Sequence, residues 1–468
     1  MKRIILLTIS LLLAYSAFSQ DITGAWYGVL NVGTKLPLVL NISEKDGVRS
    51  ATLDSPTQGA KGIPVTAVSF ENEKLTFSIS NLGVEYEGVW QNDSIIGTFK
   101  QNGMSFPLSL SRTENKDGAN SRNGARPVST APARPQDPTP PYPYHSEDVK
   151  FENKAAGITL AGTLTLPQEG KDFPVAALVT GSGPQNRNEE LLNHRPFLVL
   201  SDYLTRNGIA VLRYDDRGVA ESGGSFSTAT IDDFASDAAA AVNYLKTRKE
   251  INPKKIGVIG HSEGGTIAFM LASNKNNGLA YIVSMAGMAI PGDSLLRMQR
   301  YLLSKAMGIS DEDITKTQEV MDDITAVVKK YPTEFILQNM DSLATEVSPD
   351  SLKGNANAKA SFQQMIRQTM TSEIKSLINC NPTEVLAKIK CPVLALNGEK
   401  DLQVPPDINL DRIKALVKGK VTAKKYPNLN HLFQHCATGL PTEYGNIEET
   451  LSPEVLSNIS EWIKKTLK

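Results

Sequence analysis

Near the start of this chain, hydrophobic and polar residues alternate in the short runs that are typical of β-strands. Such runs cover residues 25–30, 36–40, 75–79 and 84–90. Polar or glycine-containing breaks separate them at intervals of roughly ten residues, which predicts a small all-β barrel or sandwich over residues 20–112. A ligand-binding barrel and a structural appendage are both possible, and the appendage is favoured.

Residues 113–147 have the composition of a linker. Asn, Gly, Ser, Ala, Arg and Pro dominate them, and residues 138–143 read PTPPYP. Such a segment cannot bury enough apolar surface to offset the entropy lost on ordering, and its prolines stiffen it. We therefore expect a tether between two domains.

From residue 148 onward, short apolar runs alternate with helical stretches such as residues 231–249. The apolar runs cover residues 175–180, 209–214, 256–260, 280–284 and 392–396. Near-continuous apolar strands are what a parallel sheet requires when helices bury both of its faces. The alternation predicts a doubly wound, mostly parallel α/β domain over residues 148–468.

Residues 290–385 interrupt this alternation. They are rich in Leu, Met, Lys, Asp and Glu at helical spacing and contain no strand-like run. Because the segment falls between two predicted strands, we expect a helical cap above the carboxyl edge of the sheet. A peripheral helical bundle is the alternative.

The first 19 residues have the pattern of a secretory signal peptide. A basic start at residues 1–3 precedes an apolar run over residues 4–13, and residues 17–19 resemble a cleavage site. The run is too short to span a bilayer comfortably, and no later stretch reaches about 18 apolar residues. We expect an exported protein, periplasmic or secreted, without a transmembrane segment.

Charge and cysteine content exclude some classes of function. The 49 Lys and Arg residues nearly cancel the 50 Asp and Glu residues, so nucleic-acid binding is not indicated. The 3 cysteines suit neither a disulfide framework nor a zinc site. A Cys380–Cys436 bridge is possible in an oxidising compartment, whereas Cys391 begins an apolar run and is expected to be buried.

One motif carries a candidate nucleophile. Residues 260–265 read GHSEGG, directly after the apolar run at residues 256–259 and before a stretch of small and apolar residues. This is Gly-x-Ser-x-Gly in the strand–turn–helix context of a nucleophile elbow, where small residues let strand and helix approach. The pattern predicts that Ser262 is the nucleophile, with a helix N-terminus directed at developing negative charge.

A serine nucleophile requires a base, and the chain has 5 histidines. In this type of fold the base follows the serine in the chain, which leaves His431 and His435. His431 lies in a loop after the strand-like residues 421–426 and is the better candidate. His435 lies one helical turn further on.

The base in turn requires an acid that orients the imidazole and stabilises its protonated form. The apolar run at residues 392–396 leads into a turn that ends at Asp401. This position after a strand suits the acid of a catalytic triad. Glu399 and Asp407 are its competitors.

An oxyanion also needs two N–H donors. One is expected from Glu263, the residue after the nucleophile. The other is expected from the loop at residues 180–184, TGSGP, where the glycines expose the backbone and Ser182 is the best candidate.

Residues 150–468 resemble the α/β-hydrolase superfamily, and especially EstD-type bacterial carboxylesterases. The matching segments are GSGPQNR at 181–187, RYDDRG at 213–218, GHSEGG at 260–265, NGEKD at 397–401 and NHLF at 430–433. The resemblance implies ester hydrolysis through an acyl-enzyme without a cofactor. It also implies a loop-supporting role for Arg217. Because the first loop reads TGSG rather than the HGGG of many lipases, lipase activity is not implied.

These patterns together predict an exported serine hydrolase that cleaves small-molecule carboxylic esters, with short acyl groups preferred. Two alternatives stay open. Serine peptidases with capped α/β folds carry the same triad, so short peptides are a second class of substrate. The third possibility is a binding protein whose β domain and cap hold a glycan or lipid and whose catalytic residues are vestigial.

Overall fold

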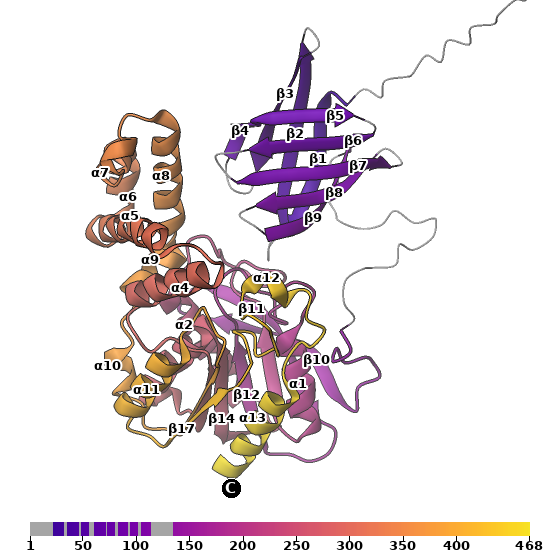
Figure 1. The fold of residues 1–468 in the computed structure, drawn as a ribbon. Coiled ribbons are helices and arrows are strands. Elements are labelled where there is room, and N and C mark those ends of the chain that lie inside the picture. Colours follow the sequence, from indigo (N-terminus) through magenta and orange to yellow (C-terminus); the bar gives the residue numbers. More distant parts are fainter. Residues whose placement is uncertain are drawn as a thin grey trace, which may run out of the picture. The chain divides into compact units, whose positions relative to one another are not determined.

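The computed structural model describes two compact units, which divide between residues 123 and 124 (Figure 1). The described residues are 22–31, 35–45, 48–55, 60–71, 73–79, 83–91, 94–101, 104–113 and 134–468. The predicted signal peptide at residues 1–19 lies outside them.

The N-terminal unit is one antiparallel sheet in the order β4-β3-β2-β1-β9-β8-β7-β6-β5. Side chains alternate between its two faces, and one face forms a single core around the fully buried Trp26. Strand β3 also contacts β5, so the sheet curls into a half-barrel. The predicted small all-β domain is confirmed. Its strands are β1 (Gly24–Asn31), β2 (Lys35–Lys45), β3 (Val48–Ser55), β4 (Ala60–Pro64), β5 (Ala67–Glu71), β6 (Lys74–Ile79), β7 (Val84–Gln91), β8 (Ser94–Gln101) and β9 (Met104–Ser111).

The C-terminal unit is built on a mixed sheet in the order β10-β11-β13-β12-β14-β15-β16-β17. Pairing is antiparallel from β10 through β11 to β13 and parallel from β13 onward. The central strands are buried throughout, as a sheet covered on both faces requires. The strands are β10 (Tyr144–Asn153), β11 (Ile158–Pro167), β12 (Phe173–Val179), β13 (Ala210–Tyr214), β14 (Ile251–His261), β15 (Tyr281–Met285), β16 (Val393–Gly398) and β17 (Val421–Tyr426).

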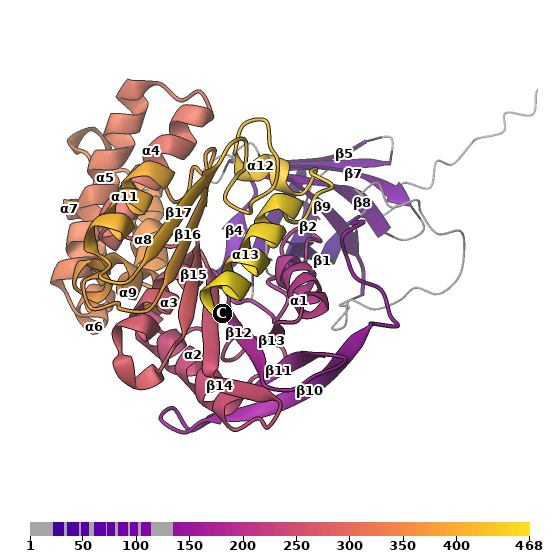
Figure 2. The ribbon, with the colours of Figure 1, turned by 90° about the horizontal axis from the view of Figure 1, so that it is seen from below.

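Helices cover both faces of this sheet. Helices α1 (Pro196–Arg206) and α13 (Pro453–Thr466) contact each other and one face, as Figure 2 shows. Helices α2 (Ile231–Lys246), α3 (Glu263–Ser273) and α11 (Pro406–Leu416) cover the other. The short α12 (Pro441–Tyr444) lies between β17 and α13 in the chain. This arrangement confirms the predicted doubly wound α/β domain.

A helical insertion separates β15 from β16, as predicted. Its apolar residues form their own hydrophobic cluster, which includes Ile324, Val328, Ile336 and Ile366. The Gly183 N–H, in the loop after β12, donates to the Glu373 carboxylate of α9, which places the insertion over the carboxyl edge of the sheet as a cap. Its helices are α4 (Gly292–Ala306), α5 (Asp311–Lys330), α6 (Thr333–Gln338), α7 (Met340–Glu346), α8 (Ala356–Thr369), α9 (Ser372–Asn379) and α10 (Thr383–Leu386).

The structure differs from the predicted linker at its C-terminal end. The Arg134 guanidinium donates to the backbone carbonyls of Ile447, Leu192 and Gly445. Strand β10 begins at Tyr144, which pairs with β11. Residues 134–147 therefore belong to the C-terminal unit, because specific hydrogen bonds order a segment whose composition alone is that of a tether.

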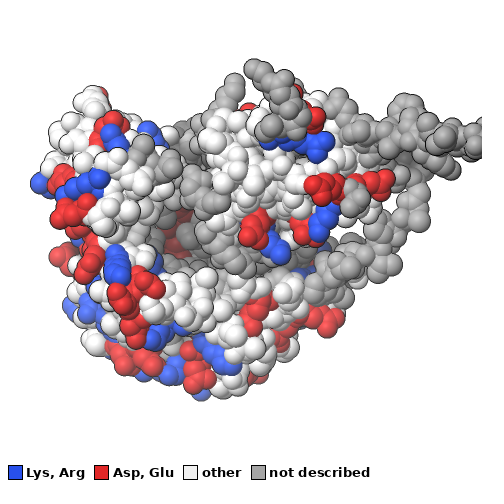
Figure 3. All heavy atoms as spheres, turned by 45° about the horizontal axis from the view of Figure 1, so that its top comes forward, with Lys and Arg blue, Asp and Glu red and all other residues white. Residues whose placement is uncertain are grey.

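Lys and Arg side chains are interspersed with Asp and Glu over the described atoms in Figure 3, so this face carries no extended region of one sign. No helix in the described part of the chain is long and apolar enough to cross a membrane.

Cys380, Cys391 and Cys436 are all free thiols, and Cys391 is half-buried rather than buried as expected.

Candidate active site

Ser262 lies in a sharp turn between β14 and α3. Its backbone adopts φ 52° and ψ −117°, a conformation that L-residues rarely adopt, and its N–H donates to the Met285 carbonyl at 2.8 Å. The turn depends on a glycine before it, because a Cβ on Gly260 would lie 1.9 Å from the Gly264 carbonyl oxygen. The predicted nucleophile elbow is therefore formed, with Ser262 half-buried at the carboxyl end of the sheet.

Two further predicted residues meet at the same edge. Asp401 follows β16, His431 follows β17, and the Nδ1 of His431 lies 2.8 Å from the Oδ2 of Asp401. Both side chains are buried. Because a carboxylate only accepts, Nδ1 is the protonated nitrogen, which leaves Nε2 able to accept a proton.

Asp401 is held in place by three further donors. Its Oδ1 accepts the backbone N–H groups of Gln403 and Val404, each at 2.9 Å. Its Oδ2 accepts from the Asn397 side-chain amide at 3.3 Å. These bonds fix the carboxylate and therefore the orientation of the His431 ring.

The competing residues lie elsewhere. The His435 ring is exposed and bonds to Glu449 at 2.9 Å. Glu399 is exposed, and Asp407 forms an exposed ion pair with Lys425 at 2.6 Å. The structure thus brings His431 and Asp401 together and leaves their competitors outside the pair.

The proposed nucleophile and the proposed base are linked through His261. His261, the residue before Ser262, lies 3.0 Å through its Nε2 from the His431 carbonyl oxygen, and the two rings are 4.9 Å apart. In the described part of the chain the Ser262 hydroxyl makes no hydrogen bond to His431. Such bonds often tighten only when substrate is bound.

The loop after β12 lies against the nucleophile. A Cβ on Gly181 would lie 3.3 Å from the Cβ of Ser262, so the loop passes within van der Waals distance of the serine. Among the described residues, neither the Ser182 N–H nor the Glu263 N–H has a hydrogen-bond acceptor. Both predicted oxyanion donors are therefore available at the serine's side of the sheet.

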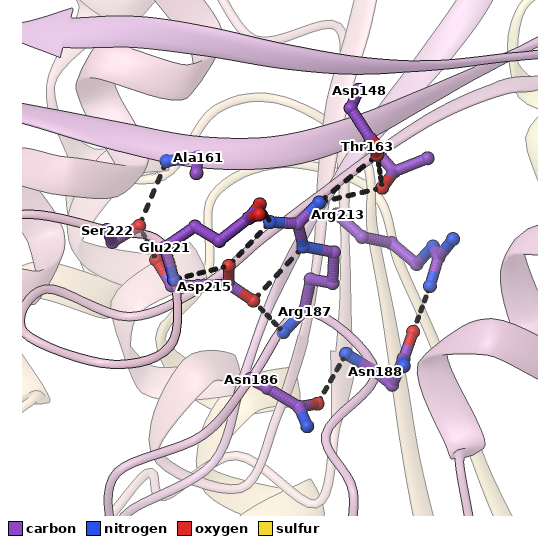
Figure 4. Close-up of polar contacts among 10 residues, drawn as sticks. All are labelled: Asp148, Ala161, Thr163, Asn186, Arg187, Asn188, Arg213, Asp215, Glu221 and Ser222. Atoms are coloured by element: carbon purple, nitrogen blue, oxygen red, sulfur yellow. Dashed lines mark hydrogen bonds and ion pairs between the residues drawn. The ribbon is translucent and has the colours of Figure 1, made fainter.

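Side chains that follow β13 hold this loop. The Asp216 carboxylate accepts from the Thr180 hydroxyl at 2.7 Å and from the Gln185 N–H at 2.9 Å. The Arg187 guanidinium makes a bidentate ion pair with Asp215, with a shortest contact of 2.6 Å (Figure 4). These contacts join the GSGPQNR and RYDDRG segments to each other.

Arg217 points away from the loop toward helix α2. Its guanidinium bonds to the buried Asp237 at 2.6 Å and to Asp233 at 2.9 Å. These ion pairs anchor the segment after β13 to α2, so any support that Arg217 gives the loop is indirect, through the neighbouring Asp215 and Asp216.

Buried carboxyl groups surround the loop. Burial, with smaller contributions from Glu373 and Asp216, raises the pKa of Glu263 to about 8. Burial likewise raises the pKa of Asp216 to about 8 and raises that of Glu373. Glu373 accepts from the Gly183 N–H at 2.6 Å, so a cap residue lies beside the predicted oxyanion position.

Sequence reasoning missed two residues of this region, Glu189 and Glu373. Glu189 accepts from the Gly181 N–H at 2.8 Å and from His261. Neither glutamate belongs to a sequence motif with a predicted function. Only the fold brings them to His261 and to the loop after β12. In the part of the chain that is described, no three His, Cys, Asp or Glu side chains are grouped as a metal site requires.

The chain is similar to a known protein family and to known esterases. A family model described as serine aminopeptidase, S33, matches residues 196–435, just over half of the chain. Esterase EstD of Thermotoga maritima is 25% identical over 332 residues, which cover 69% of this chain and 70% of that protein. The bifunctional esterase/perhydrolase DCH of Acinetobacter calcoaceticus is 27% identical over 269 residues, 55% of this chain and 84% of its own length.

A solved Pyrococcus furiosus esterase aligns with 69% of this chain and 92% of its own, at 18% identity and a TM-score of 0.42. The family match covers the strands and helices that carry Ser262, Asp401 and His431. The chain therefore belongs to the α/β-hydrolase family of serine hydrolases whose model is described as serine aminopeptidase, S33.

Proposed function

We propose that this protein hydrolyses small-molecule carboxylic esters with short acyl groups through an acyl-enzyme on Ser262. The observation that carries the proposal is the nucleophile elbow at the carboxyl edge of a sheet that also holds the buried His431–Asp401 pair. The relatives named as esterases support ester substrates over other acyl compounds.

In the first half of the reaction, the Ser262 Oγ attacks the ester carbonyl carbon while its proton passes to the Nε2 of His431. The Asp401 carboxylate, 2.8 Å from Nδ1, stabilises the imidazolium that forms. His431 then gives that proton to the alkoxide oxygen as the C–O bond breaks, which releases the alcohol and leaves the acyl group on Ser262.

In the second half, His431 takes a proton from water, whose oxygen attacks the acyl carbon. The bond to the Ser262 Oγ then breaks, the proton returns to that oxygen, and the acid is released. In both halves the tetrahedral oxyanion accepts from the N–H groups of Ser182 and Glu263. Glu263 is the first residue of α3, so the positive end of that helix also faces the oxyanion.

The test is hydrolysis of p-nitrophenyl acetate, butyrate and octanoate by the mature protein, beside Ser262→Ala. We expect turnover to fall as the acyl chain lengthens and to drop by at least about 10⁴-fold in the variant. Full esterase turnover by Ser262→Ala would refute the mechanism. Faster octanoate than acetate turnover would refute the short-acyl preference alone.

A second candidate function is cleavage of short peptides, because the matching family model is described as a serine aminopeptidase. Chromogenic aminoacyl and dipeptide substrates compared with the esters decide between the two, and dominant peptide turnover would favour the peptidase. A folded protein that turns over neither and does not react with a fluorophosphonate would favour a binding role.

We also propose that the chain is exported, as its first 19 residues predict. Expression with those residues in a bacterial host, followed by fractionation and N-terminal sequencing, tests this. Processing near residue 19 and recovery outside the cytoplasm are expected, and an intact cytoplasmic chain would contradict export.

A further inference from the structure

A second histidine–carboxylate pair lies beside His431 and Asp401. It consists of His261, the last residue of β14, and Glu189, in the loop before α1. The His261 Nδ1 lies 2.9 Å from the Glu189 Oε1, and both residues are only 6% exposed. The proposed mechanism uses neither side chain.

Each residue of this pair has a second partner in a different part of the site. The His261 Nε2 lies 3.0 Å from the backbone carbonyl oxygen of His431. The Glu189 Oε1 also accepts the Gly181 N–H at 2.8 Å, one residue before the proposed donor Ser182. The pair therefore joins the loop of the proposed base to the loop of the oxyanion donors, and His261 is bonded directly to Ser262 through the chain.

The partners determine where the protons lie. A carbonyl oxygen only accepts, so the His261 Nε2 must carry a proton. The Glu189 carboxylate also only accepts, so Nδ1 must carry one as well, and the ring is an imidazolium. Burial lowers the pKa of His261, but the Glu189 carboxylate and the hydrogen bonds outweigh it and leave the pKa above its usual value.

We propose that His261 and Glu189 are positioning residues, which set the His431 loop and the Gly181 loop relative to Ser262 through these hydrogen bonds. This inference rests on the proposed function. If the His261 ring loses one proton, one of its nitrogens has only a lone pair. That nitrogen then faces the Glu189 carboxylate or the His431 carbonyl without a proton to donate, so one of the two hydrogen bonds breaks. Misplacement of reacting groups by about 1 Å can reduce turnover on the order of 10²-fold.

The pH dependence follows from the same geometry. The ionisable groups that face His261 are Glu189 from the loop before α1, Asp401 after β16 and the His431 ring after β17. Because the pKa of His261 is raised, both links are intact at lower pH and one is lost as the pH rises through that pKa. Turnover should therefore have an alkaline limb that depends on Glu189.

The experiment is a pH profile of kcat and KM on p-nitrophenyl butyrate for wild type, Glu189→Gln and Glu190→Gln. Glu190 is the matched control, because it is the next residue, is exposed and bonds only to the Asn186 side chain at 3.3 Å in the described part of the chain. A glutamine at 189 can still accept from Gly181, but it removes the charge that keeps His261 doubly protonated.

We expect Glu189→Gln to lower kcat about 10- to 100-fold. KM should stay within about threefold, and the alkaline limb should move to lower pH. Glu190→Gln should match wild type. Kinetics and a pH profile equal to wild type in a folded Glu189→Gln protein would overturn the inference, whereas absence of ester turnover in wild type would overturn the proposed function instead.

A second measurement needs no variant. In wild-type protein labelled with 15N-histidine, the imidazolium signal of His261 should persist to higher pH than that of a histidine with the usual pKa of about 6.5. The other four histidines lack this arrangement, in which one nitrogen faces a carboxylate and the other faces a backbone carbonyl. Loss of that signal from His261 at or below the usual histidine pKa would overturn the inference even if Glu189→Gln failed to fold.

Discussion

The substitution Asp401→Asn is expected to keep the geometry around the proposed base, His431, and to change which of its ring nitrogens carries the proton. The Oδ1 of Asp401 accepts two backbone N–H groups at 2.9 Å, so the asparagine is expected to keep its oxygen there. Its NH₂ group then replaces Oδ2 and points at the Nδ1 of His431. An NH₂ group only donates, so Nδ1 must present a lone pair and the proton of the neutral ring moves to Nε2. In that tautomer His431 cannot accept the proton of Ser262.

The size of the effect follows from what is lost and what is kept. The contact from Asn397, 3.3 Å long in the wild type, becomes donor against donor, which costs stability on the order of 1 kcal/mol. The two backbone bonds survive, so the fold should too. The variant loses both the correct His431 tautomer and the carboxylate that stabilises the imidazolium. In the trypsin-like proteases the corresponding substitution lowers kcat about 10⁴-fold, which is about 5.5 kcal/mol in activation free energy.

The assay is kcat on p-nitrophenyl butyrate, with thermal denaturation as a check on folding. Asp407→Asn is the matched control, because Asp407, in α11, is an exposed aspartate whose side chain bonds only to Lys425 in the described part of the chain. It should leave kcat unchanged. A folded Asp401→Asn protein that keeps more than about a tenth of wild-type kcat would refute this assignment of the acid.

Three further predictions concern the loop, the turn and the buried carboxyls. Arg187→Lys cannot reproduce the bidentate contact with Asp215 and should lower kcat on the order of tenfold with the fold retained, which steady-state kinetics and circular dichroism would check. Gly260→Ala places a methyl group 1.9 Å from the Gly264 carbonyl oxygen and should lower the free energy of unfolding by about 3 kcal/mol or more, measured in urea. Burial raises the pKa of Glu263 to about 8, so the folded protein favours its protonated form. The free energy of unfolding should therefore fall as the pH rises from about 5 through 8. Urea titrations at pH 6 and pH 9 should show a smaller decrease for Glu263→Gln, and an unchanged decrease would contradict the raised pKa.

Much of the fold was predictable because the strands of a buried sheet appear in the sequence as short apolar runs. The run at residues 256–260 lies within β14 (Ile251–His261), and the helical segment at 290–385 matches the cap between β15 and β16. Strand β10 (Tyr144–Asn153) was less visible, because it lies at the sheet edge and only alternate side chains are buried. Polar residues at its start therefore resembled the continuation of a linker.

The site divides in the same way between local and non-local signals. Ser262 and Glu263 could be proposed from the sequence because a nucleophile elbow is a local motif, and Asp401 and His431 because they follow strands in a known order. Glu189 and Glu373 were missed, since their contacts, with His261 and with the Gly183 N–H, join segments far apart in the chain. A glutamate on an amphipathic helix or in a polar loop looks solvent-exposed until the fold places it.

The two histidine–carboxylate pairs show how similar side chains acquire different roles. In both, Nδ1 donates to a carboxylate within 2.9 Å. The difference lies at Nε2, which in His261 faces a backbone carbonyl oxygen, whereas in His431 it has no acceptor among the described residues. A carbonyl requires a proton on Nε2, so His261 holds two protons and is inert as a base. His431 meets no such requirement, so its Nε2 is free for the proposed proton transfer from Ser262, while the His261 ring donates to its backbone carbonyl.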